Sequence, residues 1–372
     1  MHLADYGAEV IKIEDLDAGD YLRHFPPRVA NAAGEEVNPA FEAINRGKRA
    51  LCLDLKSAAG RELFLRLTDS ADAVLESFRP GVMERLGLGW DVLHARNPRL
   101  VLCSISGWGQ DGPLAQAAGH DLNYAALAGV IDQNRAAGRP AIPGLQTADV
   151  LGGALSATSA LLIALLGAQR TGLGRRIDVA MADGLLMHQV FATAEVDAGT
   201  DPVPEAGLLT GGVACYGVYA CADGLWLAVG ALEAKFWSAL CQALERPDWT
   251  QRHWSSGEWP GSPAAAQTRS ELAALLASQP RAHWLERLAK VDACVTPVLT
   301  PAEALAHPQF ARGGRLHRAG GVTLAGPLAP MSDFRFEARP APRSGEDTRA
   351  VLRQAGLAEA EIDSLAQAGV IA

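Results

Sequence analysis

The sequence has few lysines and no excess of positive charge. Only five of its 372 residues are lysine, and 42 acidic residues outnumber 33 lysines and arginines, for a net charge of −9. Nucleic-acid binding needs a basic face, so this balance argues against a protein of that class. A local basic cluster remains near the start of the chain: Lys12, Lys48, Lys56, Arg46, Arg49, Arg79 and Arg85. Such a cluster fits either an anionic small molecule, such as a phosphorylated cofactor, or a solvated helix face.

Paired cysteines and long apolar runs are also missing. The six cysteines include no CxxC pair and no metal-ligand spacing, which predicts free thiols and no metal site. Free thiols are typical of a reducing cytosol, so we expect a cytoplasmic protein. No stretch of eighteen residues is apolar without interruption, and the start lacks a signal-peptide pattern. We therefore expect no membrane span.

The first half of the chain alternates strand-like and helix-like segments. Strands are predicted at 8–14, 50–55, 73–77 and 100–106, and helices at 58–69 and 152–169. This alternation predicts an α/β fold with a parallel sheet covered by helices on both faces. Ligands in such sheets bind beyond the carboxyl ends of the strands. A site is therefore expected at the turns after Ser77 and Ser106.

The opening residues, 1–7, are typical of the last turns of a helix, with Gly7 as its stop. A chain that opens in this way leads us to expect that an earlier strand and turn are missing.

The second half predicts a separate small domain. Strands at 216–221 and 225–229 flank Ala222-Asp223-Gly224, a hairpin turn signature, and helices are predicted at 235–244, 269–278 and 282–290. The tail predicts two short helices, at 346–355 and 358–368. The expected organisation is a large α/β domain at 1–185, a linker at 186–213, a small α+β domain at 214–306, and a return linker at 307–372 whose C-terminal helices pack on the large domain.

Two polar residues beside glycine-containing turns are candidates for proton transfer. His120 lies in Gly119-His120-Asp121-Leu122-Asn123-Tyr124, and Asp149 precedes Gly152-Gly153 and a long apolar run. A pair of unlike bases can remove a proton from one face of a carbon and return one to the other. Each residue also has an ordinary structural role open to it: His120 as a buried core histidine, Asp149 as a helix N-cap, and Asp121 as a turn residue that bonds the backbone.

Several segments together resemble the family III CoA-transferase superfamily of the CaiB/BaiF type. They are 3–14, 45–49 with 53–56, 76–82, 87–89, 106–110, and 171–174 with 178–181. The resemblance implies a Rossmann-like, parallel-sheet large domain, a smaller α+β domain, and an interlocked homodimer of open-ring subunits. It also implies an acyl-CoA thioester as substrate, with coenzyme A as part of that substrate and no tightly bound cofactor.

Two chemistries compete within this superfamily. One branch transfers CoA between carboxylic acids, and the other, the α-methylacyl-CoA racemases, inverts the carbon next to the thioester. The segments 119–124, 229–233 and 292–298 resemble the racemase branch. By that resemblance His120 and Asp149 are the two bases, Glu233 supports His120, and Asp121 either orients His120 or bonds the backbone. Leu145 departs from the pattern, because racemases often have asparagine four residues before the aspartate, and this leaves the hydrogen bonding around Asp149 open.

The resemblance and the predicted strand ends together select the residues that contact CoA. The candidates are Leu53, Asp54, Lys56, Ser77, Phe78, Arg79, Arg85, Gly119, Asn123 and Tyr124. Phe78, Arg79 and Arg85 follow the strand end at Ser77 and are well placed for the CoA phosphates, unless they are ordinary surface residues.

Two alternatives to the racemase remain. In a transferase, the carboxylate of Asp149 attacks the donor thioester, forms an anhydride and then carries CoA as an aspartyl thioester. A non-catalytic CoA-binding scaffold is disfavoured, because His120, Asp149 and Glu233 are all present.

Overall fold

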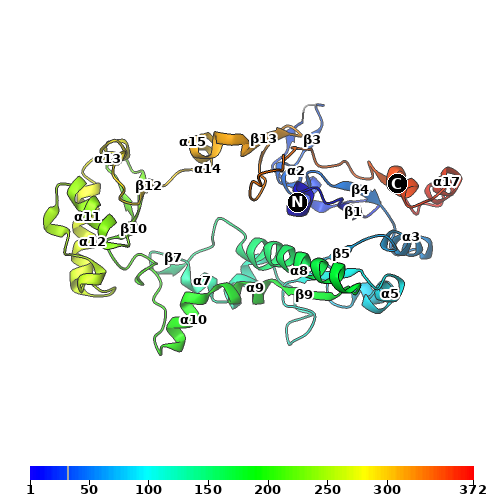
Figure 1. Ribbon diagram of the computed structural model, residues 1–372, viewed down its shortest axis with the longest axis horizontal. Coiled ribbons are helices and arrows are strands. Elements are labelled where there is room, and N and C mark those ends of the chain that lie inside the picture. Colours follow the sequence, from blue (N-terminus) through cyan, green and yellow to red (C-terminus); the bar gives the residue numbers. More distant parts are fainter. Residues whose placement is uncertain (32) are drawn as a thin grey trace. The chain divides into compact units, whose positions relative to one another are not determined.

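The computed structural model describes residues 1–31 and 33–372, and these separate into two compact units. Unit 1 comprises 1–120, 148–184 and 305–372, and unit 2 comprises 121–147 and 185–304 (Figure 1). The sequence analysis assigned 121–147 to the large domain, whereas the structure groups this segment with unit 2. The reason is tertiary: the Gln189 side chain donates to the Ala128 carbonyl, and the Gly138 N–H donates to Glu205 at 2.8 Å.

Unit 1 contains two parallel sheets. One pairs β1 (Ile11–Glu14) with β4 (Arg49–Cys52), and the other has the order β5 (Ala73–Glu76), β6 (Val101–Ser106), β9 (Arg176–Ala180). The predicted parallel α/β architecture is therefore present, but as two sheets rather than one. Among the described strands, β1 pairs only with β4 and β5 pairs only with β6.

Helices cover both faces of the three-stranded sheet. On one face, α3 (Ala58–Thr68) and α5 (Trp90–Arg96) enclose a core that also includes residues of α16 (Thr348–Gln354) and α17 (Glu359–Gln367). On the other face, α8 (Ser156–Thr171) packs on Val101 and Cys103 of β6 (Figure 1). The C-terminal helices thus pack on the strands of the first half of the chain.

The helix that carries Asp149 begins earlier than its apolar pattern predicts. A π-helical segment, η2 (Ala148–Leu155), leads directly into α8, and the helix stops at Gly172, whose φ is +75°. The early start depends on a close contact: a Cβ on Gly152 would lie 2.2 Å from the Met181 carbonyl oxygen. Apolar periodicity along the chain does not reveal such a contact.

The return segment is tied to the start of the chain by a buried ion pair. The Arg46 guanidinium contacts the Asp5 carboxylate at 2.6 Å and donates to the Ala325 carbonyl at 3.0 Å. The remaining elements of this part of the chain are short: α1 (His2–Asp5), η1 (Tyr21–His24), β2 (Val29–Ala30), β3 (Glu36–Val37), α2 (Pro39–Asn45), α4 (Val82–Arg85), α14 (Pro301–Ala306), α15 (Pro308–Ala311), η5 (Arg312–Gly314), β13 (Leu316–Ala319) and β14 (Val322–Ala325).

Unit 2 is built on an antiparallel sheet of order β10 (Tyr216–Ala220), β11 (Trp226–Gly230), β12 (Val295–Pro297). The predicted hairpin is confirmed, and β12 is an additional strand that the sequence analysis missed. The helices are α11 (Ala234–Ala243), α12 (Pro263–Leu276) and α13 (Arg281–Leu288), packed around Trp237, Trp249 and Leu272. Helix α12 begins before the predicted 269, because Ser262 caps it and Pro263 occupies its first turn.

The segment predicted to be a linker, 186–213, contains α10 (Val190–Asp197) and the last residues of α9 (Met181–His188). Val190 and Phe191 of α10 are exposed, so this helix has no single buried apolar face to generate a helical period. The other short elements of the unit are α6 (Asp121–Leu127), α7 (Val130–Gln133), the hairpin of β7 (Arg135–Ala136) with β8 (Arg139–Pro140), and, after α11, η3 (Pro247–Trp249) and η4 (Trp254–Ser256).

Candidate active site

His120 is exposed and immediately precedes α6. An exposed position excludes the buried core histidine that the sequence left open. Asp121 is the first residue of α6, where a carboxylate is favoured by the partial positive charge of the helix N-terminus. The imidazole is therefore presented at a helix start, within reach of solvent and of a bound molecule.

Asp149 is also exposed and lies in the first turn of η2. It is inside the helix rather than at the N-cap position before it. π-Helical turns are uncommon and occur frequently at functional sites. The N-terminus of a helix carries a partial positive charge, so the start of η2 favours an anion nearby.

Two residues close to Asp149 in the sequence bear on its surroundings. Gly152 lies against the backbone of Met181, because a Cβ on Gly152 would be 2.2 Å from the Met181 carbonyl oxygen. Leu145, at the position where asparagine was expected, is 57% exposed. Leucine supplies no side-chain hydrogen bond, so any polar support of Asp149 comes from other groups.

Glu233 is exposed in unit 2 and stands at the N-cap of α11. Its backbone carbonyl accepts the N–H groups of Phe236 and Trp237 at 3.0 and 3.1 Å. The carboxylate makes no capping bond to the helix, so it remains available for another role. Because His120 belongs to unit 1, support of His120 by Glu233 stays a prediction.

The turn after β5 presents several of the predicted CoA contacts. Ser77, Phe78 and Arg79 are all exposed there. The Arg85 guanidinium folds back over the same turn, since a Cβ on Gly81 would lie 3.1 Å from its Nη1. Two guanidinium groups thus belong to one exposed turn at the carboxyl end of a parallel strand, a position suited to phosphate.

The other residues predicted to contact CoA differ in how far their side chains are exposed. Lys56 and Asn123 are exposed, and Gly119 is half-buried. Leu53 is only 2% exposed, its N–H donates to the Glu14 carbonyl, and it bridges to Ile371 near the chain end. Tyr124 is also buried, at 8%. The half-buried Asp54 accepts the Lys56 N–H at 2.9 Å, which orders the loop after β4.

Glu76 is a residue of this region that the sequence analysis missed. It ends β5, is buried, and lies opposite Ser104 of β6 in the parallel register. Its Oε2 accepts the Phe78 N–H at 2.7 Å, which fixes the backbone of the exposed turn. Burial raises the pKa of Glu76, although the bonds from Ser104 and Phe78 oppose the shift. In the sequence, the only feature that could have indicated Glu76 is the position of a carboxylate at the end of a predicted strand.

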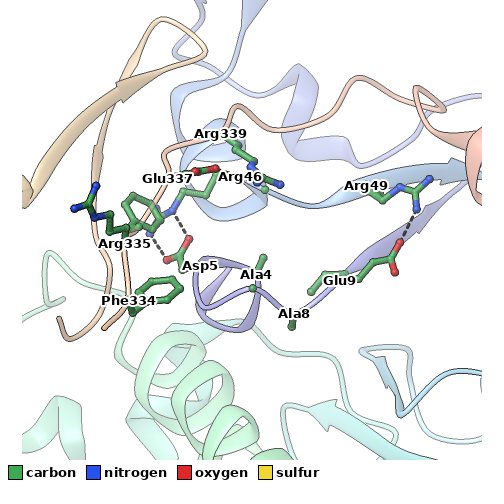
Figure 2. A pocket seen from close by; sticks show the side chains of 14 residues that line it. Ala4, Asp5, Ala8, Glu9, Arg46, Arg49, Phe334, Arg335, Glu337 and Arg339 are labelled. Atoms are coloured by element: carbon green, nitrogen blue, oxygen red, sulfur yellow. Dashed lines mark hydrogen bonds and ion pairs between the residues drawn. The ribbon is translucent and has the colours of Figure 1, made fainter. Parts of the chain in front are cut away.

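A cavity of unit 1, about 490 Å³, lies away from these residues. It is lined by residues that precede β1 and β4 and by part of the return segment, including Arg335 and Arg339 (Figure 2). Most charged groups that line the cavity are paired with a group of opposite charge: Asp5 with Arg46, Glu9 with Arg49, and Glu337 with Arg339. Ligands of parallel sheets bind at the carboxyl ends of strands, and this cavity is at the amino ends, so we do not assign the chemistry to it.

The family model described as CoA-transferase family III matches residues 1–348. The chain belongs to this family. It is 35% identical to the α-methylacyl-CoA racemase of Mus musculus over 97% of its own length and 90% of the relative's. It is also 33% identical to the acetyl-CoA:oxalate CoA-transferase of Acetobacter aceti, over 96% and 92%.

A solved CaiB/BaiF family protein from Brucella suis has the same fold. The TM-score is 0.80 at 30% identity, over 95% of this chain and 93% of that one. The protein is thus an enzyme of the family III CoA-transferase and racemase superfamily. Sequence identity does not distinguish the two activities, because this chain is 33–35% identical to racemases and 33% identical to two CoA-transferases.

Proposed function

We propose that this enzyme is a 2-methylacyl-CoA racemase, which inverts the carbon next to the thioester by proton removal and return. The observation that carries the proposal is the exposed placement of two unlike bases: His120, directly before α6, and Asp149, in the first turn of η2. Glu233 at the start of α11 supplies the third residue of the racemase pattern.

The proposed reaction needs one base in each protonation state. The neutral imidazole of His120 removes the α-proton, and the C–H electron pair moves into an enolate that includes the thioester oxygen. Asp149, as a carboxylic acid, then donates its proton to the opposite face of the α-carbon. The products are the inverted thioester, an imidazolium and a carboxylate, and the reverse reaction exchanges the roles.

The enolate oxygen requires hydrogen-bond donors, because a thioester is a weak carbon acid. The backbone N–H groups at the start of η2 are the proposed donors, because the N-terminal end of a helix carries a partial positive charge, and each well-placed donor of this kind contributes about 3–4 kcal/mol to the transition state. CoA enters and leaves as part of the substrate, with its phosphates near Arg79 and Arg85. We propose no tightly bound cofactor and a cytoplasmic location, supported by six free cysteines, five of which are buried.

We also propose that the working form is a homodimer. The supporting observation is an apolar face on α8, where Leu162, Ile163 and Leu166 are 52%, 72% and 48% exposed in the single chain. Exposed apolar patches of this kind mark association surfaces.

The second candidate is a CoA transferase that uses Asp149 alone. Similarity to several CoA-transferases at 27–34% identity supports it. Asp149 would then attack the donor thioester, and the aspartyl thioester would pass CoA to an acceptor acid. In that mechanism His120 and Glu233 have no direct task, which is why we rank it second.

Incubation of the enzyme with a 2-methylacyl-CoA in heavy water tests the proposal. We expect deuterium at the α-carbon by NMR and a shift toward equal amounts of the two epimers. A parallel reaction supplies free carboxylic acids as CoA acceptors. CoA transfer to an acid, without deuterium incorporation in any acyl-CoA of a panel, would establish the transferase instead.

Single replacements separate the two bases. His120→Ala and Asp149→Ala should each abolish racemisation but leave some exchange from the epimer that the remaining base deprotonates. Each lost base should reduce the rate on the order of 10²- to 10⁴-fold. Epimer-resolved exchange measures this pattern. Near-normal racemisation by His120→Ala would contradict the role of that residue.

A further inference from the structure

The carbonyl oxygen of Leu232, directly before Glu233, accepts two side-chain hydrogen bonds. The Trp254 indole donates from Nε1 at 2.7 Å, and the His253 imidazole contacts the same oxygen from Nε2 at 3.0 Å. A backbone carbonyl has two lone pairs, and here each of them is able to accept a bond from a different side chain. Two side-chain donors on one oxygen hold this peptide in a defined orientation.

The surroundings of His253 determine which nitrogen carries its proton. Its Nδ1 accepts the Ser255 N–H at 3.3 Å and lies 2.8 Å from the Ser255 hydroxyl. Because Nδ1 accepts, Nε2 carries the hydrogen and donates to Leu232. Burial lowers the pKa of His253, which favours this neutral form.

Both donors are themselves held in place. His253 is 2% exposed, and its ring lies 6.5 Å from that of Trp237 and 5.6 Å from that of Trp254. Trp237 is fully buried and donates to the Trp249 carbonyl at 2.9 Å. The two bonds to Leu232 therefore come from a packed aromatic layer rather than from mobile surface side chains.

The clamped peptide leads directly into the first turn of α11. The carbonyl of the next peptide, that of Glu233, accepts the N–H groups of Phe236 and Trp237, so the first hydrogen bonds of α11 follow directly after the clamped peptide. On the other side, the Leu232 N–H donates to the Gly230 carbonyl at 2.9 Å, at the end of β11. Glu233 thus stands between a strand end and a helix start, and its side-chain direction depends on the peptide before it.

We propose that His253 and Trp254 are positioning residues, which hold the Leu232 carbonyl and so aim the Glu233 carboxylate for catalysis. This inference rests on the proposed function, in which Glu233 supports His120. It assigns a kinetic role to two side chains that do not contact the reacting atoms.

Trp254→Phe tests the clamp, since it removes the indole donor and keeps an aromatic ring against His253. We expect kcat for α-proton exchange to fall on the order of 10-fold with KM for the acyl-CoA unchanged, because small displacements of a catalytic group are costly. His253→Leu should act similarly. His253→Gln, whose amide places a donor near the original Nε2, should recover most of the rate.

Trp284→Phe is the matched control. Trp284 is also buried in unit 2, and its Nε1 donates to the Leu276 carbonyl at 2.8 Å, so this variant loses the same kind of bond elsewhere. We expect a similar loss of thermal stability with kcat unchanged. Equal kcat in the Trp254→Phe and Trp284→Phe variants would overturn the proposal.

Two further measurements separate this inference from the proposed function. In a Glu233→Gln background, Trp254→Phe should change the rate less than twofold, and a full additional loss would show that it does not act through Glu233. Hydrogen exchange of the Phe236 and Trp237 amides reports the clamp without any activity. It should rise in Trp254→Phe and stay unchanged in Trp284→Phe, and equal protection in both would also overturn the inference. If the wild-type enzyme exchanges no α-proton, the proposed function fails, and the kinetic role assigned to His253 and Trp254 fails with it. Amide exchange of Phe236 and Trp237 then still decides whether the two side chains order the start of α11.

Discussion

At the scale of single residues, the polar groups that matter most here lie at the ends of strands and helices. Glu76 ends β5 and accepts the Phe78 N–H, whereas Ser77, Phe78 and Arg79 project from the turn that it holds. A buried carboxylate is costly when ionised, and its cost is reduced by the hydrogen bonds it accepts. The structure thus keeps an acid in the sheet to shape an exposed turn.

The Glu76→Gln substitution should remove the free-energy cost of burying an ionised carboxylate, while it keeps an oxygen that accepts the Phe78 N–H. Because the folded-state pKa of Glu76 is raised, the folded protein binds a proton more readily than the unfolded chain, and stability falls as pH rises through that pKa. The variant should therefore gain stability over the wild type as pH increases from about 5 to 8, the range above the unfolded pKa of the carboxyl. Urea unfolding at several pH values measures this.

The control for that experiment is Glu36→Gln, which changes an exposed glutamate of β3. It should give a difference from the wild type that does not vary with pH. A Glu76→Gln variant that behaves in the same way would contradict the role of burial.

At the scale of elements, the helix that carries Asp149 is positioned by a glycine contact with α9. A Cβ on Gly152 would lie 2.2 Å from the Met181 carbonyl, and one on Gly184 would lie 2.6 Å from the Gly152 carbonyl. Two backbones therefore approach each other without intervening side chains, as glycine alone permits. This contact sets the place of η2, and with it the place of Asp149.

Gly152→Ala should force η2 and α9 apart. We expect a loss of about 1–3 kcal/mol in the free energy of unfolding, the usual cost of overpacking, together with a reduced rate of α-proton exchange. Gly167→Ala, in the interior of α8, is the matched control, because a Cβ there meets only Arg175 Nε at 3.9 Å. That variant should gain up to about 1 kcal/mol from helix propensity. Thermal unfolding and the α-proton exchange assay compare the Gly152→Ala and Gly167→Ala variants. Equal stability of the two would show that η2 and α9 accommodate the added Cβ without cost, and would contradict the prediction.

At the scale of the whole molecule, an apolar helix face has no cover in the single chain. The continuous helix Ala148–Thr171 has 24 residues; its most apolar stretch of 18 residues has a mean hydropathy of 2.0, and only 28% of that stretch is buried. By length and composition alone it is able to cross a membrane, whereas the count of uninterrupted apolar residues predicted no span. A second copy of the chain would cover the same face in solution, which is the proposal we favour.

Ile163→Glu should therefore convert a dimer to a monomer. Ile163 is 72% exposed on α8, and a charge buried at an association surface is unfavourable. Val92→Glu, on α5, is the control, because Val92 is 42% exposed on a different helix. Sedimentation velocity should report a dimer for the wild type and for Val92→Glu. A monomeric wild type, or recovery of the protein only in a membrane fraction, would contradict the proposed dimer.

Local interactions, which depend on residues near one another in the chain, explain the parts of the fold that were predictable. The hydroxyls of Ser57 and Ser262 cap α3 and α12, Gly172 stops α8, and Asp223-Gly224 forms the hairpin turn. The acid–base candidates were also readable, because His120, Asp149 and Glu233 stand within recognisable segments. Each of these features depends on a few consecutive residues and on their intrinsic backbone preferences.

The features of the fold and of the candidate site that the sequence did not predict depend on contacts between distant segments of the chain. Burial of Leu53 and Tyr124, the Gly152–Met181 approach, and the two donors on Leu232 all depend on contacts between separate parts of the chain. Residues 121–147 joined unit 2 for the same reason. Such contacts arise only when the packed chain brings the partners together, because no periodicity or short motif encodes which carbonyl a given side chain will meet.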